Sequence, residues 1–271
     1  MRLRQWLPAI VCFIVAICTL TRIGIADERT LMLRALFNPA NVSAFDPSQC
    51  QTSANGALYV ALGRHVFKWP VDNLPMFEEL KPPLDAIGGP IPPNPEEPRG
   101  CPGNPYPLEA IGVDLAADGT MLASTEANDA AVFAKILRLL PGQSWQPFVE
   151  LHAEVFQSLC DGQPTMTSQG LMRCSSDKST DPDRKSENQS QYITHFRASP
   201  DLYADPFGNA FYIRCPDHRP PQCQVDYALF DYVVLGYEFR PQQLSASKVV
   251  EFDRTLRTMV ATAEVKDFVW H

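Results

Sequence analysis

Six cysteines behind an export-type leader constrain this chain more than any other feature of its sequence. Arg2 and Arg4 precede an apolar run over 7–20, and Gly24 and Ala26 supply the small residues of a peptidase site, so residues 1–26 are predicted to be a signal peptide. The run is shorter than the roughly 20 residues that cross a bilayer. Leader removal predicts a periplasmic protein, in an oxidising compartment where cysteines form disulfides.

The leader leaves two alternatives open. Cys18 follows Ile17, where a lipid-attachment site prefers a small residue, and Arg22 separates the apolar run from Ala26. The first alternative is a lipoprotein, and the second is an uncleaved N-terminal anchor. No later run reaches membrane-spanning length, so we expect no integral membrane span after leader removal.

The cysteines outside the leader are predicted to form three disulfides. Pairing between neighbours in sequence closes two short loops and one long loop, although six cysteines allow 15 connectivities and the others stay open. The spacings match no zinc motif, so we expect no metal site. The neighbour pairing gives Cys50–Cys101, Cys160–Cys174 and Cys215–Cys223.

The charge balance predicts the kind of partner. The sequence has 23 basic and 31 acidic residues, and removing residues 1–26 takes away three arginines, which leaves a net charge of −11. Such a chain repels the phosphates of nucleic acids and anionic membrane surfaces, so we expect no nucleic-acid partner. A basic protein surface would be attracted instead. The same charge also keeps a protein soluble, which is the plainer interpretation.

Short segments rich in β-branched and aromatic residues predict an α+β fold. We expect a mainly antiparallel β-sheet with hairpins, braced by disulfides, and a C-terminal helix packed on the sheet. Turns at Gly63-Arg64 and Asp118-Gly119 predict two hairpins, and Ser245 is expected to cap the helix. A small propeller or sandwich is the alternative. The expected strands are 57–62, 65–69, 110–115, 120–124, 131–140, 145–151, 192–196, 210–215, 223–230 and 232–239.

Composition divides the chain after the leader into three parts. Residues 27–174 form a β-rich region with a Pro-rich loop over 80–107, residues 175–190 form a polar loop, and residues 191–271 form antiparallel β-structure plus the C-terminal helix. The Pro-rich loop carries 10 prolines, which disfavour a regular helix or a central strand. Long loops inside a compact domain are often functional, and the alternative is a stiff surface excursion pinned by Cys101.

Sequence motifs give no sign of catalysis. GxSxG, HExxH and phosphate-binding loop motifs are absent, and no two of the five histidines are spaced at i+3 or i+4. His65 lies in an apolar strand, where packing is expected, and Asp118-Gly119 is expected as a turn rather than as part of a calcium loop. We therefore expect no catalytic, cofactor-binding or metal-binding residues, no cofactor, and a binding protein rather than an enzyme.

The C-terminal third adds a pattern of strands and cysteines. In order, residues 192–263 carry the segment Asp205–Asn209, strands that end at Cys215 and open at Cys223, the strand Val233–Phe239 and a helix that begins near Leu244. Together with the leader, this pattern resembles the periplasmic immunity proteins that neutralise lipase effectors of bacterial type VI secretion systems. The Pro-rich loop has no counterpart in the resemblance.

The resemblance implies a partner and a mode of action. The protein would bind a cognate lipase effector, a phospholipase, in the periplasm, and would cover its active-site cleft or lock its lid. That requires a rigid surface and an interface of about 1,600 Å². The contacts implied by the composition of the loops are Pro90, Pro92, Pro93, His218 and Arg219.

Two other functions stay open. A periplasmic β-scaffold hydrolase or carbohydrate-binding domain would use exposed Trp69, Trp145 or Tyr106 as platforms for sugars. A structural component of the envelope would have no soluble ligand. Turnover by the purified protein would favour the hydrolase, and protection against a purified toxin would favour the immunity protein.

Overall fold

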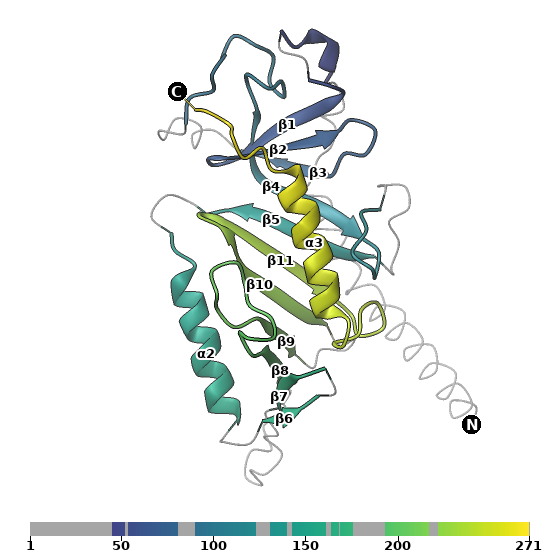
Figure 1. The fold of residues 1–271 in the computed structure, drawn as a ribbon, viewed down its shortest axis with the longest axis vertical. Helices are drawn as coiled ribbons and strands as arrows, with labels where there is room; N and C mark the ends of the chain where they lie inside the picture. The colour runs from purple at the N-terminus through teal and green to yellow at the C-terminus, as the bar shows by residue number, and fades with distance from the viewer. Residues whose placement is uncertain are drawn as a thin grey trace, which may run out of the picture. The chain divides into compact units, whose positions relative to one another are not determined.

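The strands form one 11-stranded sheet, in the order β2-β1-β4-β5-β11-β10-β9-β8-β7-β6 with β3 paired to β4 (Figure 1). Its pairs are antiparallel except for β1 with β4, which are parallel. The α+β class predicted from the sequence is confirmed. The strands are β1 (Ala57–Leu62), β2 (His65–Pro70), β3 (Met76–Glu79), β4 (Tyr106–Leu115), β5 (Val132–Arg138), β6 (Thr165–Met166), β7 (Leu171–Ser175), β8 (Ile193–Ala198), β9 (Tyr212–Pro216), β10 (Cys223–Phe230) and β11 (Val233–Phe239).

This computed structural model describes most of the chain after the predicted leader. The predicted signal peptide, most of the polar segment 175–190, and the predicted contacts His218 and Arg219 lie outside the described residues. The described ranges are 45–51, 54–80, 90–122, 131–139, 143–160, 164–167, 169–175, 193–216 and 222–270.

Side-chain alternation gives the sheet two different faces. Along β10, buried and half-buried residues alternate strictly, which is typical of a strand with one face in the core. Tyr227 and its β11 neighbour Leu235 lie on the core face, and Asp226 lies on the other face beside Gly236. The second face therefore carries more polar side chains than the first.

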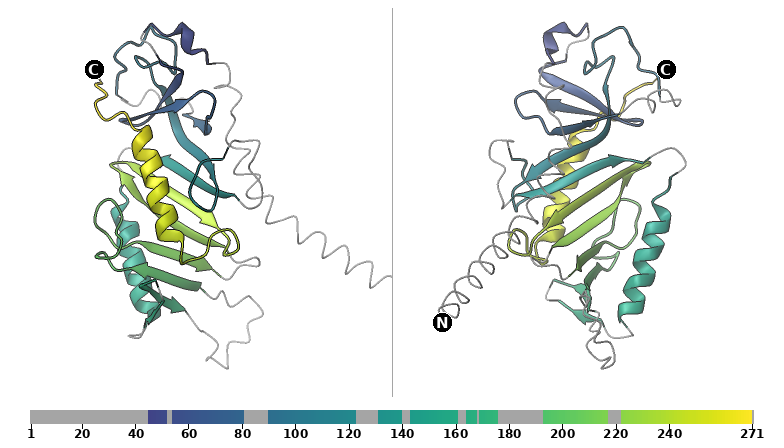
Figure 2. Two further views of the ribbon diagram at one scale, coloured as in Figure 1. Left: turned by 45° about the vertical axis from the view of Figure 1, so that its right-hand side comes forward. Right: turned by 180° about the vertical axis from the view of Figure 1, so that it is seen from behind.

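Helix α3 (Val249–Ala263) covers the core face of the sheet (Figure 2). Its buried side chains recur every three or four residues, at Val249, Phe252, Leu256 and Val260, and they join the core formed by the strands. This is the C-terminal helix that the sequence predicts. The predicted cap is wrong, because Lys248 precedes the first helical residue and no side chain caps it, while the Ser245 hydroxyl pairs with that of Ser247.

Helix α2 (Gln146–Cys160) corrects a second prediction, that residues 145–151 form a strand. The Ser144 hydroxyl accepts a hydrogen bond from the Gln146 backbone N–H at 3.2 Å, and Pro147 suits the first turn of a helix. Phe156 is buried, and His152 lies one turn before it on the same face. The apolar spacing of three and four residues continues to Cys160, which a seven-residue window does not reveal.

The first predicted hairpin is confirmed, and the second is only partly present. Strands β1 and β2 pair from Leu62 and His65 at the turn to the far end of the hairpin. After β4, Leu115 pairs with Met121 in an isolated bridge, and residues 123–124 lie outside the described residues. Contrary to the prediction for the Pro-rich stretch, its last residue, Pro107, lies inside β4 beside Ala61.

The chain end docks on the first hairpin. The Val265 backbone N–H donates to the Val66 carbonyl at 2.8 Å, and the Trp270 indole N–H donates to the Arg64 carbonyl at 2.9 Å. The sequence predicts order in this segment only if it docks, and it does dock. Among the described residues, no helix combines the length and the apolar character needed to cross a membrane.

Candidate partner-binding surface

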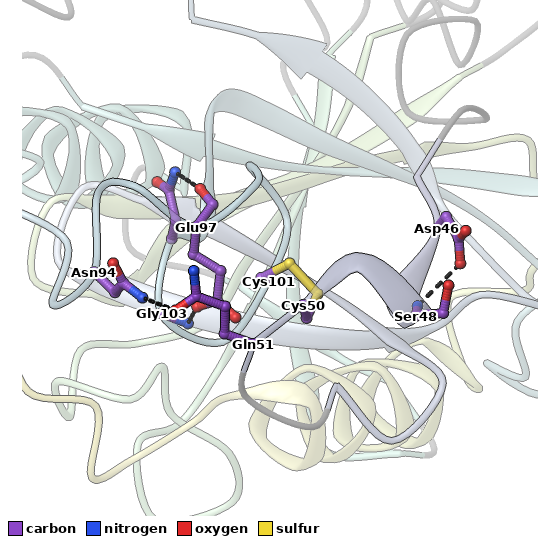
Figure 3. The surroundings of a disulfide bond; sticks show 9 residues. Asp46, Ser48, Cys50, Gln51, Asn94, Glu97, Cys101 and Gly103 are labelled. Carbon is purple, nitrogen blue, oxygen red and sulfur yellow. Dashed lines mark hydrogen bonds between the residues drawn. A yellow bond between two sulfur atoms is a disulfide. The ribbon is translucent and has the colours of Figure 1, made fainter.

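A disulfide attaches the described part of the Pro-rich loop, residues 90–105, to the segment before β1 (Figure 3). Cys50 and Cys101 are bonded, with 5.4 Å between their Cα atoms, and Cys101 is fully buried. The neighbouring Gly100 has a positive φ of 97°, and a Cβ there would lie 2.6 Å from the Leu58 side chain. The loop is therefore clamped against the β1 strand with no room for a larger residue at Gly100.

A buried carboxylate organises the interior of this loop. Glu97 is 2% exposed, and its Oε2 accepts a hydrogen bond from the Gly103 backbone N–H at 2.9 Å (Figure 3). The Asn104 side chain donates to the Glu97 carbonyl at 2.6 Å, and the Asn94 N–H donates to the Gly103 carbonyl at 2.9 Å. Because these bonds cross the loop, its backbone is held in place without regular secondary structure.

The same residues bring two sulfurs and a carboxylate close together. The ligand atoms of Cys50, Cys101 and Glu97 lie within 4.8 Å of one another. A metal ion would bind cysteine as thiolate, whereas both sulfurs here are joined in a disulfide. In the oxidised protein this group therefore serves as a structural brace.

The outer side of the loop exposes an apolar tip. Ile91 is 59% exposed and stands between Pro90 and Pro92, which are both half-buried, and Pro93 is exposed. Proline fixes φ and so removes freedom from the backbone on either side of Ile91. The structure thus places three predicted contacts, Pro90, Pro92 and Pro93, together around an isoleucine that the prediction did not include.

A second apolar surface lies on α2 and was missed by the sequence analysis, which expected a strand there. Phe148 is 48% exposed and Leu151 is 52% exposed, and the Trp145 ring stacks on Phe148 at 4.7 Å between centroids. We call these three residues the α2 ridge. The helical spacing of the apolar residues over 145–160 is the signal that would have found it.

The inner side of α2 rests on the second, more polar face of the sheet. His152 Nε2 lies 3.9 Å from Asp226 Oδ1, and the Phe156 ring contacts Tyr212. The Arg197 guanidinium lies 5.7 Å from the centroids of both of these rings. Together with the Cys160–Cys174 disulfide, these contacts seat the helix on β7 to β10.

Histidine ionisation is suppressed on this face. Burial, with smaller contributions from the charges of Arg214 and His152, lowers the pKa of His195 to about 4. Burial also lowers the pKa of His152, which the Asp226 carboxylate partly opposes. His195 is 5% exposed, so it is a neutral, covered side chain rather than an accessible acid or base.

A third polar group, on the opposite face, anchors α3. Asp253 is fully buried and accepts hydrogen bonds from the hydroxyls of Tyr203 and Tyr227. Burial raises the pKa of both tyrosines and of Asp253 itself. Arg257 completes the group and donates to the Ala204 carbonyl at 2.7 Å. Since the carboxylate is enclosed, we assign this group a structural role.

The other residues considered from sequence have different environments. Trp69 is 3% exposed, so it cannot serve as an exposed platform for sugars. It lies on β2, and its side chain packs in the hydrophobic core. Trp145 is half-buried within the α2 ridge, and Tyr106 is half-buried with the Arg99 guanidinium 6.0 Å from its ring. His65 packs against the Phe230 ring and contacts Glu264 at 2.9 Å.

The three disulfides have the neighbour pairing expected from the sequence. Besides Cys50–Cys101, Cys160 is bonded to Cys174 and Cys215 to Cys223. Cys215 and Cys223 lie at facing ends of β9 and β10. Cys160 is the last residue of α2, and its bond to Cys174 joins that helix to β7. Each bridge therefore fixes a loop or a helix to the sheet.

Comparisons with known proteins assign no family to the chain. No protein-family model matches it, and no curated protein sequence matches it. The crystal structure of the Neisseria meningitidis iron-regulated outer membrane lipoprotein FrpD is similar over 80% of this chain and 96% of that chain. The two share 10% sequence identity and superpose with a TM-score of 0.43, a likeness too distant to bear on function.

Proposed function

We propose that this chain is an exported immunity protein that binds a periplasm-acting lipase effector of a type VI secretion system and neutralises it by occlusion. The class of partner comes from the resemblance of residues 192–263 to such immunity proteins. Three disulfides suit the oxidising periplasm, which supports export to that compartment. Neutralisation by occlusion needs no chemistry from this chain, only a rigid and complementary surface.

The observation that carries the proposal is the tip around Ile91. An exposed apolar side chain between prolines, on a loop braced by Cys50–Cys101 and by the Glu97 hydrogen bond, loses little conformational entropy when it is bound. Apolar anchors that enter a pocket of the partner provide much of the free energy of protein–protein binding. The loop is therefore suited to fill the mouth of a hydrophobic active-site cleft, as a lipase has.

Net charge supports the same kind of partner. The chain has a formal net charge of −8, and acidic proteins associate faster with basic surfaces than with neutral ones. A basic rim around the cleft of the effector would thus guide the apolar tip into place.

A co-expression assay tests the proposed function. A type VI lipase effector is targeted to the periplasm of a sensitive host, with and without this protein. We expect growth to be rescued only when this protein is exported, and we expect the purified pair to elute as a stable one-to-one complex. An exported, folded protein that gives neither rescue nor complex would overturn the proposal for that toxin.

A matched pair of variants tests the role of the tip. Ile91→Asp places a charge on the apolar anchor and is expected to weaken the complex by at least about a hundredfold. Val269→Asp makes the same kind of change at a side chain that is 67% exposed elsewhere, and it should leave affinity unchanged. Full rescue and unchanged affinity with Ile91→Asp would assign binding to another surface, for which Phe148→Asp on the α2 ridge is the next test.

A further inference from the structure

An open cavity of about 380 Å³ lies between the first hairpin and the end of α3. Figure 1 shows the last turns of α3 beside β1 and β2. The volume falls within the range of sites that bind small molecules. The lining combines small and apolar residues with a few polar ones: Ala54, Asn55, Gly56, Ala57, Tyr59, Lys68, Trp69, Pro70, Met259, Thr262 and Ala263.

Trp69 is one of the lining residues, and its buried side chain carries an unsatisfied donor. The residue is 3% exposed, and its indole Nε1–H has no hydrogen-bond partner among the described residues. Buried polar groups in folded proteins are nearly always paired, and an unpaired one calls for an explanation such as a missing ligand. The indole N–H can only donate, so the missing partner must carry an acceptor.

Lys68, the residue before Trp69 in β2, brings a positive charge to the lining. Its side chain is exposed, and within the part of the chain that the structure describes it forms no ion pair. The other lining residues carry no formal charge, so the cavity as a whole is cationic although the protein is acidic. An anionic acceptor therefore fits better than a neutral one, because a charge-assisted hydrogen bond is stronger.

The remaining walls suit an apolar chain. Met259 and Ala263 come from α3, and Tyr59 and Pro70 come from the hairpin. Methionine adapts its shape to irregular apolar partners, so it can follow a flexible hydrocarbon. From these features we infer that the cavity is a binding site for a monocarboxylate with an apolar chain, such as a free fatty acid.

In this arrangement the carboxylate accepts the Trp69 N–H and lies near the Lys68 ammonium group, and the hydrocarbon chain lies along Met259 and Ala263. The proposed carboxylate site is argued from the residues that line the cavity, and it does not depend on the proposed immunity function. Failure of the lipase assay would leave it intact, and its own failure would leave the immunity proposal intact.

Titration with sodium decanoate tests the site. The full chain, with its disulfides formed and labelled with ¹⁵N, is titrated while the indole N–H resonance of Trp69 is followed. We expect that resonance to move downfield and saturate with decanoate, and to stay in place with decyltrimethylammonium, which has the same chain and the opposite charge. Trp69→Phe and Lys68→Met are each expected to weaken decanoate binding about tenfold.

Two threonines on α3 provide a matched control. Thr262 lines the cavity and Thr258 does not, yet both are exposed and both donate a hydrogen bond to the carbonyl four residues earlier. Thr262→Trp should block the mouth and abolish decanoate binding, whereas Thr258→Trp should bind as the parent protein does. The inference is overturned if decanoate does not bind, if the cationic chain binds equally well, or if Thr262→Trp binds decanoate while keeping its circular dichroism spectrum.

Discussion

Arg257 lies one helical turn after Asp253 on α3, and its Nε is 2.7 Å from the Asp253 Oδ2 in the interior of the protein. The carboxylate has no exposed surface, and 18% of the arginine side chain is exposed. Tyr203, from the segment before β9, and Tyr227 of β10 donate to the same carboxylate. Three segments distant in sequence thus meet at one charge, which fixes the rotation of α3 on the sheet.

Asp253→Asn is predicted to destabilise the protein by about 3 kcal/mol, because it leaves Arg257 without a counter-charge in a mostly buried site. Urea unfolding followed by circular dichroism measures this loss. Arg257→Met removes the other partner and should have a comparable effect. The double variant should lose less than the sum of the two, since the second change removes a charge that is already unpaired.

Arg254→Met is the control for that series. Arg254 is exposed and lies 5.0 Å from the Tyr203 ring, and the structure gives it no contact with Asp253. Its replacement should change the free energy of unfolding by less than about 1 kcal/mol. Strict additivity of the Asp253 and Arg257 variants would show that the two residues do not act as a pair.

The lowered pKa of His195 predicts that the free energy of unfolding falls at acidic pH. Its pKa is about 4 in the folded protein and 6.5 in a model peptide, so between these values the unfolded chain binds the proton more readily than the folded one. Stability from this residue is therefore present above pH 6.5 and is lost as the pH falls toward 4. Allowing for partial screening by solvent, we expect a loss of about 2 kcal/mol.

Two variants isolate this contribution. His195→Gln removes the titrating group, so the free energy of unfolding should fall less steeply between pH 6.5 and 4 than in the parent protein. Arg214→Gln removes the nearest charge that opposes protonation of His195, and should raise the pKa of that imidazole in an NMR titration. A slope that is unchanged in His195→Gln would assign the acid sensitivity to other groups.

Local patterns in the sequence predict α3 and most of the longer strands, because each of these elements buries one face, but they do not predict β3, β6 or β7. In β11, the residues Val233, Leu235, Tyr237 and Phe239 alternate with their neighbours, and all four are buried. The disulfide partners follow from the same picture, since Cys215 and Cys223 close a loop between adjacent antiparallel strands. Strand alternation and the pairing of nearby cysteines depend on residues that are close in sequence.

Long-range packing sets the features that sequence patterns do not predict. Trp69 is buried because the hairpin packs in the same core as α3, which lies about 180 residues later in the chain. Pro107 can enter β4 because a parallel pair with β1 there needs no hydrogen bond from its nitrogen, while its carbonyl accepts from the Leu80 N–H. The environment of Ile91 likewise depends on bonds made by Glu97 and Cys101.

Helix α2 is predicted to depend on the Cys160–Cys174 disulfide more than the sheet does. Phe156 is the buried residue of this helix, so packing alone holds it weakly. Replacing both cysteines with serine should cost about 3 kcal/mol, from the entropy of a loop of this length. Amide hydrogen exchange should rise over 146–160 and stay low in β10 and β11. Uniform loss of protection would instead indicate that α2 and the sheet unfold together.

Glu97 and Gly103 are predicted to stabilise the 90–105 loop as one unit. Glu97→Ala leaves the buried Gly103 N–H without its acceptor and should cost about 2 kcal/mol. Gly103→Ala should have a similar effect, since its Cβ would collide with the Glu97 carboxylate and displace it. Because both changes break the same bond, the double variant should be barely less stable than either single one.

Gly208→Ala is the matched control outside the loop. Its Cβ meets nothing within 4 Å, and the strain of its positive φ of 83° is expected to cost about 1 kcal/mol. If protease cleavage within 90–105 rises in the two loop variants and not in Gly208→Ala, the carboxylate is the brace of the loop. Unchanged cleavage in Glu97→Ala would leave the Cys50–Cys101 disulfide as sufficient.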